Sequence, residues 1–184
     1  MVEVQLHDTI NIDALLPREM AERAEHVGVE KTRLDPVRLV ALAVLAGAFI
    51  GFGSMFSVAV TAGTENTVPY GLARLIGGVV FSLGLILVIV GGAELFTGNN
   101  LMIMACASGK VKPGELLRAW LIVYVGNFLG AVGLAMLVFL TDGYSHGNGA
   151  VGVVALGSAE AKASFSVFQA LTHGVLANVL VCLA

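Results

Sequence analysis

The sequence predicts an all-α membrane protein, and three observations support this fold class. Hydrophobic residues make up 57% of the 184 residues and charged residues only 12%, with a mean hydropathy of +0.89. Four stretches are long and nearly free of charge, and each reaches the roughly 20 residues that a helix needs to cross about 30 Å of hydrocarbon. Glycines recur four apart within them, as at Gly47 and Gly51 or Gly126 and Gly130, a spacing that lets helices pack closely in lipid.

Charge and cysteine usage exclude several other classes. The net charge of −3, without a long basic block, provides no electrostatic footprint for nucleic acid, so no nucleic-acid partner is expected. Cys106 and Cys182 both lie in apolar runs and lack the spacing of metal ligands. We expect them to be small residues of the core, and we expect neither a metal nor a cofactor.

The chain divides into an N-terminal region, residues 1–36, and a transmembrane domain, residues 37–184. In the first region, "LLPREMAERAEHVGVEK" predicts a short amphipathic helix with Pro17 in its first turn and Gly28 near its end. This helix is expected to lie against the bundle or the membrane surface. The predicted spans cover about residues 38–63, 72–108 with a break near 94–100, 116–140 and 163–184.

The distribution of basic residues predicts the orientation of the spans. They gather before the first span and between the second and third: Lys31, Arg33, Arg38, Lys110, Lys112 and Arg118. Cytoplasmic loops carry this excess, so both flanks and the N-terminus are expected in the cytoplasm. Residues 141–162, whose only lysine or arginine is Lys162, are then expected to form an extracytoplasmic loop.

The second span contains the stretch "GGAELFTGNN", residues 91–100. Its uncharged neighbourhood is about 35 residues long, or about 50 Å as a straight helix, against about 30 Å of hydrocarbon. The excess length predicts non-helical backbone inside the membrane, which is tolerated only where protein buries it or where it lines a water-filled cavity. Freed N–H groups after Thr97 and Gly98 would favour an anion. The break therefore indicates a pathway for a small anion.

Three motifs in this order, "AELFTGNNLMIMACASGKV", "VYVGNFLGA" and "GVLANVLVCLA", resemble the formate/nitrite transporter family along nearly the whole chain. The N-terminal "LLPREMAERAEHVGVEK" is also similar to that family's helix before the membrane. The resemblance implies an aquaporin-like protomer of six spans in the cell inner (cytoplasmic) membrane. It further implies an Ω-shaped loop in the second span, a homopentamer with one pore per protomer, and passage of formate, nitrite or hydrosulfide.

The same resemblance implies roles for individual residues. Thr97 matches the loop threonine that meets substrate, and the family's apolar constrictions fall on Leu95, Phe96, Phe81 and Leu85. Lys162 aligns with a basic residue at the extracytoplasmic mouth, although it could equally be a lysine at a span end. The residues expected to support the loop are Asn127, Asn178, Glu94, Gly98 and Asn99.

Two ionisable residues, Glu94 and His173, lie within the predicted spans. Glu94 directly precedes the break, so its carboxylate is expected to accept hydrogen bonds from N–H groups of the loop or the second half-helix. His173 lies in the fourth span, whereas the family's central pore histidine belongs to the fifth. We interpret His173 as a packed or protomer-interface residue.

About four of the six expected spans are present, so the sequence is interpreted as truncated within the fourth span or as part of a longer protein. The predicted function is that of a channel or transporter, not an enzyme, for a small monovalent weak-acid anion. Formate is favoured, nitrite and hydrosulfide remain open, and proton-linked transport follows from the cost of desolvating an anion. A membrane subunit of a redox complex is disfavoured, because paired histidines for haem are absent from the spans.

Overall fold

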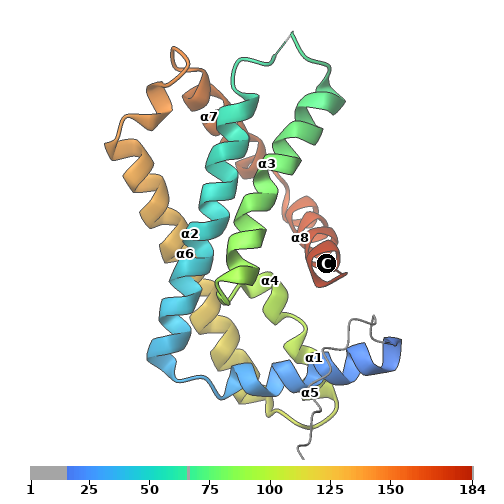
Figure 1. Ribbon diagram of the computed structural model, residues 1–184. Coiled ribbons are helices and arrows are strands. Elements are labelled where there is room, and N and C mark those ends of the chain that lie inside the picture. Colours follow the sequence, from blue (N-terminus) through green and yellow to red (C-terminus); the bar gives the residue numbers. More distant parts are fainter. Residues whose placement is uncertain (1–15, 66, 184) are drawn as a thin grey trace, which may run out of the picture.

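The computed structural model describes residues 16–65 and 67–183, and within these ranges all regular structure is helical. Three long helices, α2 (Pro36–Thr61), α3 (Tyr70–Val90) and α6 (Pro113–Leu140), run alongside one another, with α2 packed against both others (Figure 1). Each is long and apolar enough to cross a membrane. The predicted all-α class is confirmed.

Glycines make the close crossings of α2 with its neighbours. A Cβ on Gly47 would lie 2.0 Å from the carbonyl oxygen of Asn127, and one on Gly130 would lie 2.0 Å from that of Val44. On the other side, Gly53 and Gly84 bring α2 against α3 in the same way. The backbones therefore touch where the sequence lacks side chains, as the glycine spacing predicts.

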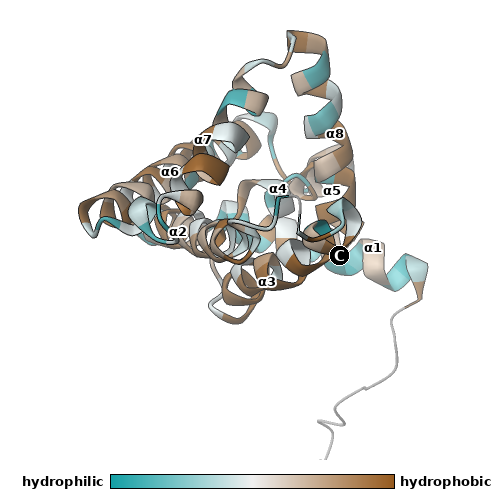
Figure 2. Ribbon diagram, turned by 90° about the horizontal axis from the view of Figure 1, so that it is seen from above, coloured by the Kyte–Doolittle hydropathy of each residue, from teal (hydrophilic) through white to brown (hydrophobic). Residues whose placement is uncertain are grey.

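Helix α1 (Pro17–Thr32) lies across one end of the bundle and packs against the short helix α5 (Met102–Ala107) (Figures 1 and 2). The helix ends at Thr32, so Gly28 lies near its end, as expected, but does not terminate it. Gly28 is buried within the helix, where a Cβ would lie 3.1 Å from the Cβ of Ala105 and 3.3 Å from the Cα of Met102. The glycine serves close approach to α5, not helix termination.

The second predicted span is broken, as expected, but its break begins earlier than residues 94–100. Helix α3 ends at Val90, and Gly92 adopts φ +60°, a left-handed conformation that commonly ends a helix at glycine. Residues 91–95 are irregular, and the short helices α4 (Phe96–Asn99) and α5 follow. The two glycines therefore start the break, and "FTGN" already belongs to the following helix, α4, which continues toward the end of the bundle where α1 lies (Figure 1).

The segment expected to be an extracytoplasmic loop, residues 141–162, is largely helical and not irregular. The side of the membrane on which it lies stays a prediction. The segment contains a 3-10 turn, η1 (Gly143–Ser145), and the helix α7 (Ala150–Ala163). The alanines after Gly149 favour a helix, which buries Val151 and packs on η1 and α2. Helix α8 (Val167–Leu183) then continues after a bend of 112°, and the bent pair α7–α8 counts as a candidate fourth span.

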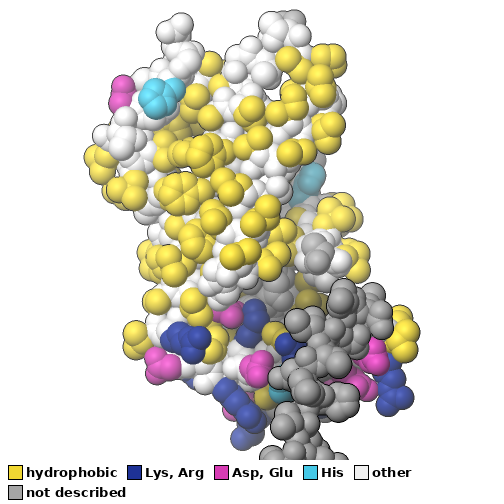
Figure 3. All heavy atoms as spheres, viewed as in Figure 1, with side chains coloured by type: hydrophobic (Ala, Val, Ile, Leu, Met, Phe, Trp, Pro, Cys, Tyr) yellow, Lys and Arg dark blue, Asp and Glu magenta, His cyan; other side chains and the backbone are white. Residues whose placement is uncertain are grey.

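Apolar side chains cover the middle of the face shown in Figure 3, whereas lysine, arginine, aspartate and glutamate gather at the end where α1 lies. Part of this charge is paired: Lys110, between α5 and α6, donates a hydrogen bond to Glu25 of α1. This hydrogen bond holds the pKa of Glu25 below its usual value. The apolar band and charged end match a chain that spans a membrane.

Candidate functional site at the helix break

The backbone of the break makes hydrogen bonds to neighbouring helices. The N–H of Ala93 donates to Val88 O (2.9 Å), and the N–H of Glu94 donates across to Leu42 O of α2 (3.2 Å). Lipid could not replace these bonds, because it has no groups that pair with N–H or C=O. The break therefore depends on the surrounding protein.

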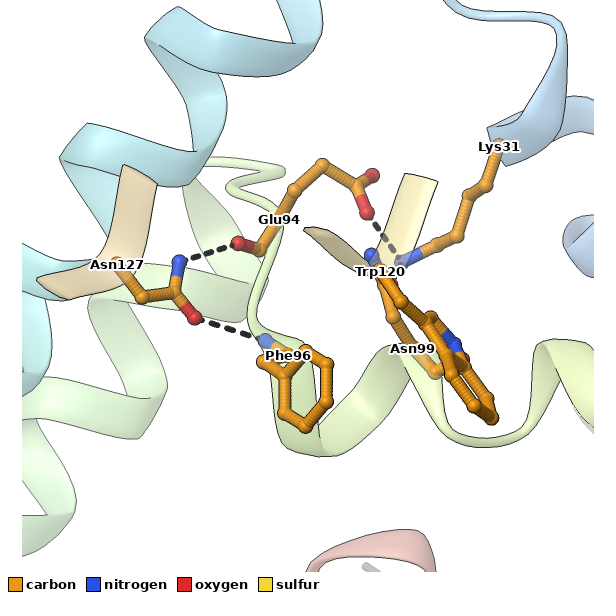
Figure 4. Close-up of polar contacts among 6 residues, drawn as sticks. All are labelled: Lys31, Glu94, Phe96, Asn99, Trp120 and Asn127. Atoms are coloured by element: carbon orange, nitrogen blue, oxygen red, sulfur yellow. Dashed lines mark hydrogen bonds and ion pairs between the residues drawn. The ribbon is translucent and has the colours of Figure 1, made fainter. Parts of the chain in front are cut away.

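Asn127 of α6 makes three hydrogen bonds that fix the break, of which Figure 4 shows those to Glu94 and Phe96. Its Oδ1 accepts the N–H of Phe96 at 2.8 Å. Its Nδ2 donates to Glu94 O at 2.9 Å and to Ala43 O of α2 at 2.8 Å. One side-chain amide thus joins α2, α6 and both sides of Leu95, and it satisfies two backbone groups of the break, Phe96 N–H and Glu94 O, that no helix satisfies.

Glu94 is almost fully buried, with 5% of its surface exposed, and its carboxylate is paired with Lys31 of α1. The Nζ atom of Lys31 lies 2.9 Å from Glu94 Oε2 and 2.8 Å from Asn99 Oδ1 (Figure 4). This corrects the expectation that the carboxylate caps N–H groups of the loop. A buried carboxylate is costly without an opposite charge, and Lys31 supplies that charge from outside the spans.

Aromatic side chains of α6 hold the short helix α4. Trp120 donates its Nε1–H to Asn99 O at 2.9 Å. The ring of Phe96 lies edge-on to those of Trp120 and Tyr124, with centroids 6.2 and 5.4 Å apart. Asn99 is fully buried, and its Nδ2 has no hydrogen-bond partner among the described residues.

Thr97 presents a buried hydroxyl at the break. Its Oγ1 has no hydrogen-bond partner within residues 16–65 and 67–183, although its carbonyl is 3.5 Å from the Sγ of Cys182 on α8. Next to it, Asn100 donates a hydrogen bond to Asn178 Oδ1, and Asn178 Nδ2 donates to Gly174 O at 2.7 Å. Helix α8 therefore contacts the segment after the break through the amide of Asn178 and the thiol of Cys182.

Of the remaining predicted constriction residues, Leu95 lies in the break, and Phe81 and Leu85 lie before it on α3. Leu95 packs beside the core cluster of Ala46, Val88 and Ala93, and Leu85 is half-buried on α3. Phe81, one helical turn before Leu85, lines a cavity of about 730 Å³ between α2, α3 and α7. This cavity lies on the α3 side of the break.

The structure does not bring Lys162 into the cavity of Phe81. Lys162 instead lines a separate cavity of about 440 Å³ between α2, α6 and α7, together with Tyr144. His173 is exposed on α8, and its ring is stacked on that of Phe165 with centroids 4.7 Å apart. In the described part of the chain, no three histidine, cysteine, aspartate or glutamate side chains are arranged to hold a metal ion.

Sequence reasoning missed Lys31, Trp120 and Asn100 as contacts of the break. Lys31 was assigned to the cytoplasmic charge flank, and its partner Glu94 is 63 residues away. Trp120 and Asn100 lie within or beside the quoted motifs, but nothing in their spacing indicates their partners. The sequence does carry one indication of the Lys31 contact. A glutamate buried in a span needs a nearby cation, and the chain has only 10 lysines and arginines that could supply it.

Comparison with known proteins identifies the family. The sequence profile described as "Formate/nitrite transporter" matches residues 18–184. The chain belongs to this family. Among its relatives, the formate channel FocA of Escherichia coli (strain K12) is 44% identical over 94% of this chain and 60% of its own length. The formate channel FocA of Haemophilus influenzae is 33% identical over 93% of this chain and 60% of its own.

A solved structure described as a "Pentameric formate channel with formate bound" superposes with a TM-score of 0.75 at 39% identity, covering 80% of this chain and 58% of its own. The fold is therefore the aquaporin-like helical bundle of these channels. The chain spans about 60% of the length of the curated relatives it matches.

Proposed function

We propose that this protein is a channel for a small monovalent weak-acid anion, formate foremost, across the cytoplasmic membrane. Support comes from its family, from relatives named formate channels, and from a solved neighbour described as pentameric with formate bound. The proposal includes a homopentamer, as in that solved neighbour. It also places the α1 end in the cytoplasm, because the basic residues gather there. Nitrite and hydrosulfide are the alternative substrates.

One observation carries the proposal: the hydroxyl of Thr97 is buried and unpartnered among the described residues, at a helix break that neighbouring side chains hold in place. Buried polar groups are nearly always hydrogen-bonded, and an exception calls for an explanation such as a transient ligand. A threonine O–H can donate to an anion. The costly break is explained if it presents this group to a permeating ion.

The mechanism follows from the placement of apolar and polar groups. The anion passes Phe81 and Leu85 on α3, then Leu95 and Phe96 at the break, and meets Thr97. Moving a bare charge between apolar side chains is very unfavourable, so the anion takes a proton from hydronium in the water at the mouth, crosses the constriction as the neutral acid and returns the proton to water on the far side. The carbonyl oxygen of the neutral acid can still accept the O–H of Thr97. Transport is then linked to protons and is favoured at low pH.

The test is formate flux into proteoliposomes containing the full-length protein. Thr97→Ala should lower flux about tenfold, because losing one hydrogen bond in the rate-limiting state costs about 1.4 kcal/mol. Thr97→Ser keeps the hydroxyl and should retain most flux. Thr141→Ala is the matched control, since its hydroxyl is exposed and bonds only Val138 O of its own helix. Unchanged flux in Thr97→Ala would refute the assignment.

A second measurement chooses the substrate. Formate, nitrite and hydrosulfide compete in the same vesicles, and the proposal expects formate to have the highest flux at equal concentration. Imposing an inward proton gradient should accelerate formate entry if the neutral acid crosses the constriction. Flux that ignores the proton gradient would leave a channel for the bare anion.

A further inference from the structure

The cavity that contains Phe81 opens beside the first turns of α3. It has a volume of about 730 Å³ and is lined by residues at the end of α2, in the α2–α3 turn, on α3 and on α7. Two charged side chains, Arg74 and Glu65, contribute to its wall. Its cation is therefore Arg74, whereas Lys162 lines the neighbouring cavity.

Arg74 lies on the same face of α3 as the proposed constriction residues. Gly78, Phe81 and Leu85 follow it by four, seven and eleven residues, which are the intervals of one helix face. Arg74 stands about 10 Å above Phe81 along the helix axis, at 1.5 Å per residue. A Cβ on Gly78, between them, would meet nothing within 4 Å, so space is open below Arg74.

The guanidinium of Arg74 is available to a ligand. It lies over the ring of Tyr70, 5.5 Å from the centroid, and makes no ion pair with a carboxylate in the described ranges, Glu65 included. Two threonine hydroxyls in the cavity wall are already committed, because Thr61 donates to Ser57 O (2.8 Å) and Thr64 donates to Thr61 O (2.7 Å). Among the residues that line this cavity, Arg74 is the charged donor.

Building on the proposed function, we propose that Arg74, and not Lys162, recruits the anion at the mouth of this pathway and favours anions with two oxygens. A guanidinium offers parallel N–H donors that match the two oxygens of a carboxylate, whereas an ammonium acts as a point charge. Formate and nitrite each present two oxygens, and hydrosulfide presents none. The positive charge also raises the local anion concentration in a manner that salt weakens.

The test compares Arg74→Gln, Arg74→Lys and Lys162→Gln in the full-length protein in proteoliposomes. Initial fluxes of formate and of hydrosulfide are measured against concentration, at low and at high ionic strength. Arg74→Gln should raise the half-saturating formate concentration about three- to tenfold at low salt, leave the maximal flux unchanged, and remove most of the salt dependence. Lys162→Gln should change each value by less than twofold.

Arg74→Lys separates charge from shape. It should keep the salt dependence, yet lose about threefold in preference for formate over hydrosulfide. Unchanged half-saturation in Arg74→Gln, or a larger effect in Lys162→Gln, would overturn the assignment of recruitment. An unchanged preference in Arg74→Lys would overturn the assignment of shape selection. Absence of formate flux in the unaltered protein would instead refute the proposed function, and it is read before any variant.

Discussion

The crossing of α2 with α6 and the break after α3 are joined by Asn127 but held by different forces. At the crossing, Gly47 and Gly130 let two regular helices touch, and each helix satisfies its own backbone. At the break, residues 91–95 leave the helical pattern, and their polar groups find partners on α2 and α6. Regular helices in lipid need only fitting shapes, whereas a break needs specific polar partners.

The crossing and the break should therefore be sensitive to different substitutions. Shape at the crossing is a matter of van der Waals space, so adding one methyl group is the relevant perturbation. Bonding at the break is a matter of unmet donors and acceptors, so removing an amide or an ammonium is the relevant one. The expected effects decrease from the crossing at Gly47, through the break, to the exposed end of the molecule at Glu25.

The largest effect is expected from Gly47→Ala. The new Cβ would lie 2.0 Å from the carbonyl oxygen of Asn127, which is backbone and cannot move aside as a side chain would. We expect no folded protein in a detergent extract analysed by size-exclusion chromatography. Gly133→Ala, on α6 with open space around it, is the control and should behave as the parent protein. A folded Gly47→Ala protein would contradict the packing.

Asn127→Leu should be next in size. It leaves the Phe96 N–H and the carbonyl of Glu94 without partners and removes a second hydrogen bond from the carbonyl of Ala43, and each buried unmet group costs about 1–3 kcal/mol. The midpoint of thermal unfolding in detergent should fall strongly. Asn127→Asp keeps the acceptor for the Phe96 N–H but puts a carboxylate oxygen against the carbonyls of Glu94 and Ala43, so its unfolding midpoint should fall as well. Equal midpoints for Asn127→Leu and the parent would show that the amide does not hold the break.

Lys31→Met tests the ion pair beneath the break. Removing one partner of a buried pair leaves an uncompensated charge, a loss of about 3–5 kcal/mol. The double variant Lys31→Met/Glu94→Gln removes that charge and should regain much of the loss. A thermal-unfolding series of both variants measures it. If the double variant is no more stable than the single one, the pairing of Lys31 with Glu94 is not what stabilises the site.

The smallest effect is expected at Glu25. Its pKa is lowered chiefly by the hydrogen bond from Lys110, so the contact stabilises the protein above the unfolded pKa of the carboxyl and is lost as pH falls through the lower folded pKa. Glu25→Gln should therefore show a smaller fall in unfolding midpoint between pH 6 and acid pH, about 3, than the parent does. Glu22→Gln, which is exposed on the same helix, is the control. Identical acid sensitivity in all three proteins would rule out this contribution.

Much of the architecture is predictable because it follows from local patterns. The three long helices follow from uncharged stretches, the break from the length of residues 75–110, and the glycine crossings from spacing. The earlier start of the break is also local, since only Gly92 adopts the left-handed turn there. The helix α7 was missed because glycines and serines around it resemble a loop, while its packing on α2 is tertiary.

The site is less predictable because its contacts join distant parts of the chain. The family resemblance predicts supporting roles for Asn127 and Asn178, but the sequence alone does not indicate which groups they bond. Lys31 was interpreted as one of several basic residues flanking the first span. Only the fold places its ammonium between Glu94 and Asn99. The reason for a glycine at position 28 is also tertiary, because a Cβ there would crowd Ala105 and Met102 of α5.

The central claim is that the permeation pathway passes the break at Thr97. The most direct measurement is labelling of Thr97→Cys by a small methanethiosulfonate reagent in full-length protein whose Cys106 and Cys182 are replaced by alanine. The account predicts that labelling blocks formate flux and that excess formate slows the labelling. Labelling that is unaffected by formate, or complete labelling that leaves the flux unchanged, would contradict a pathway through the break.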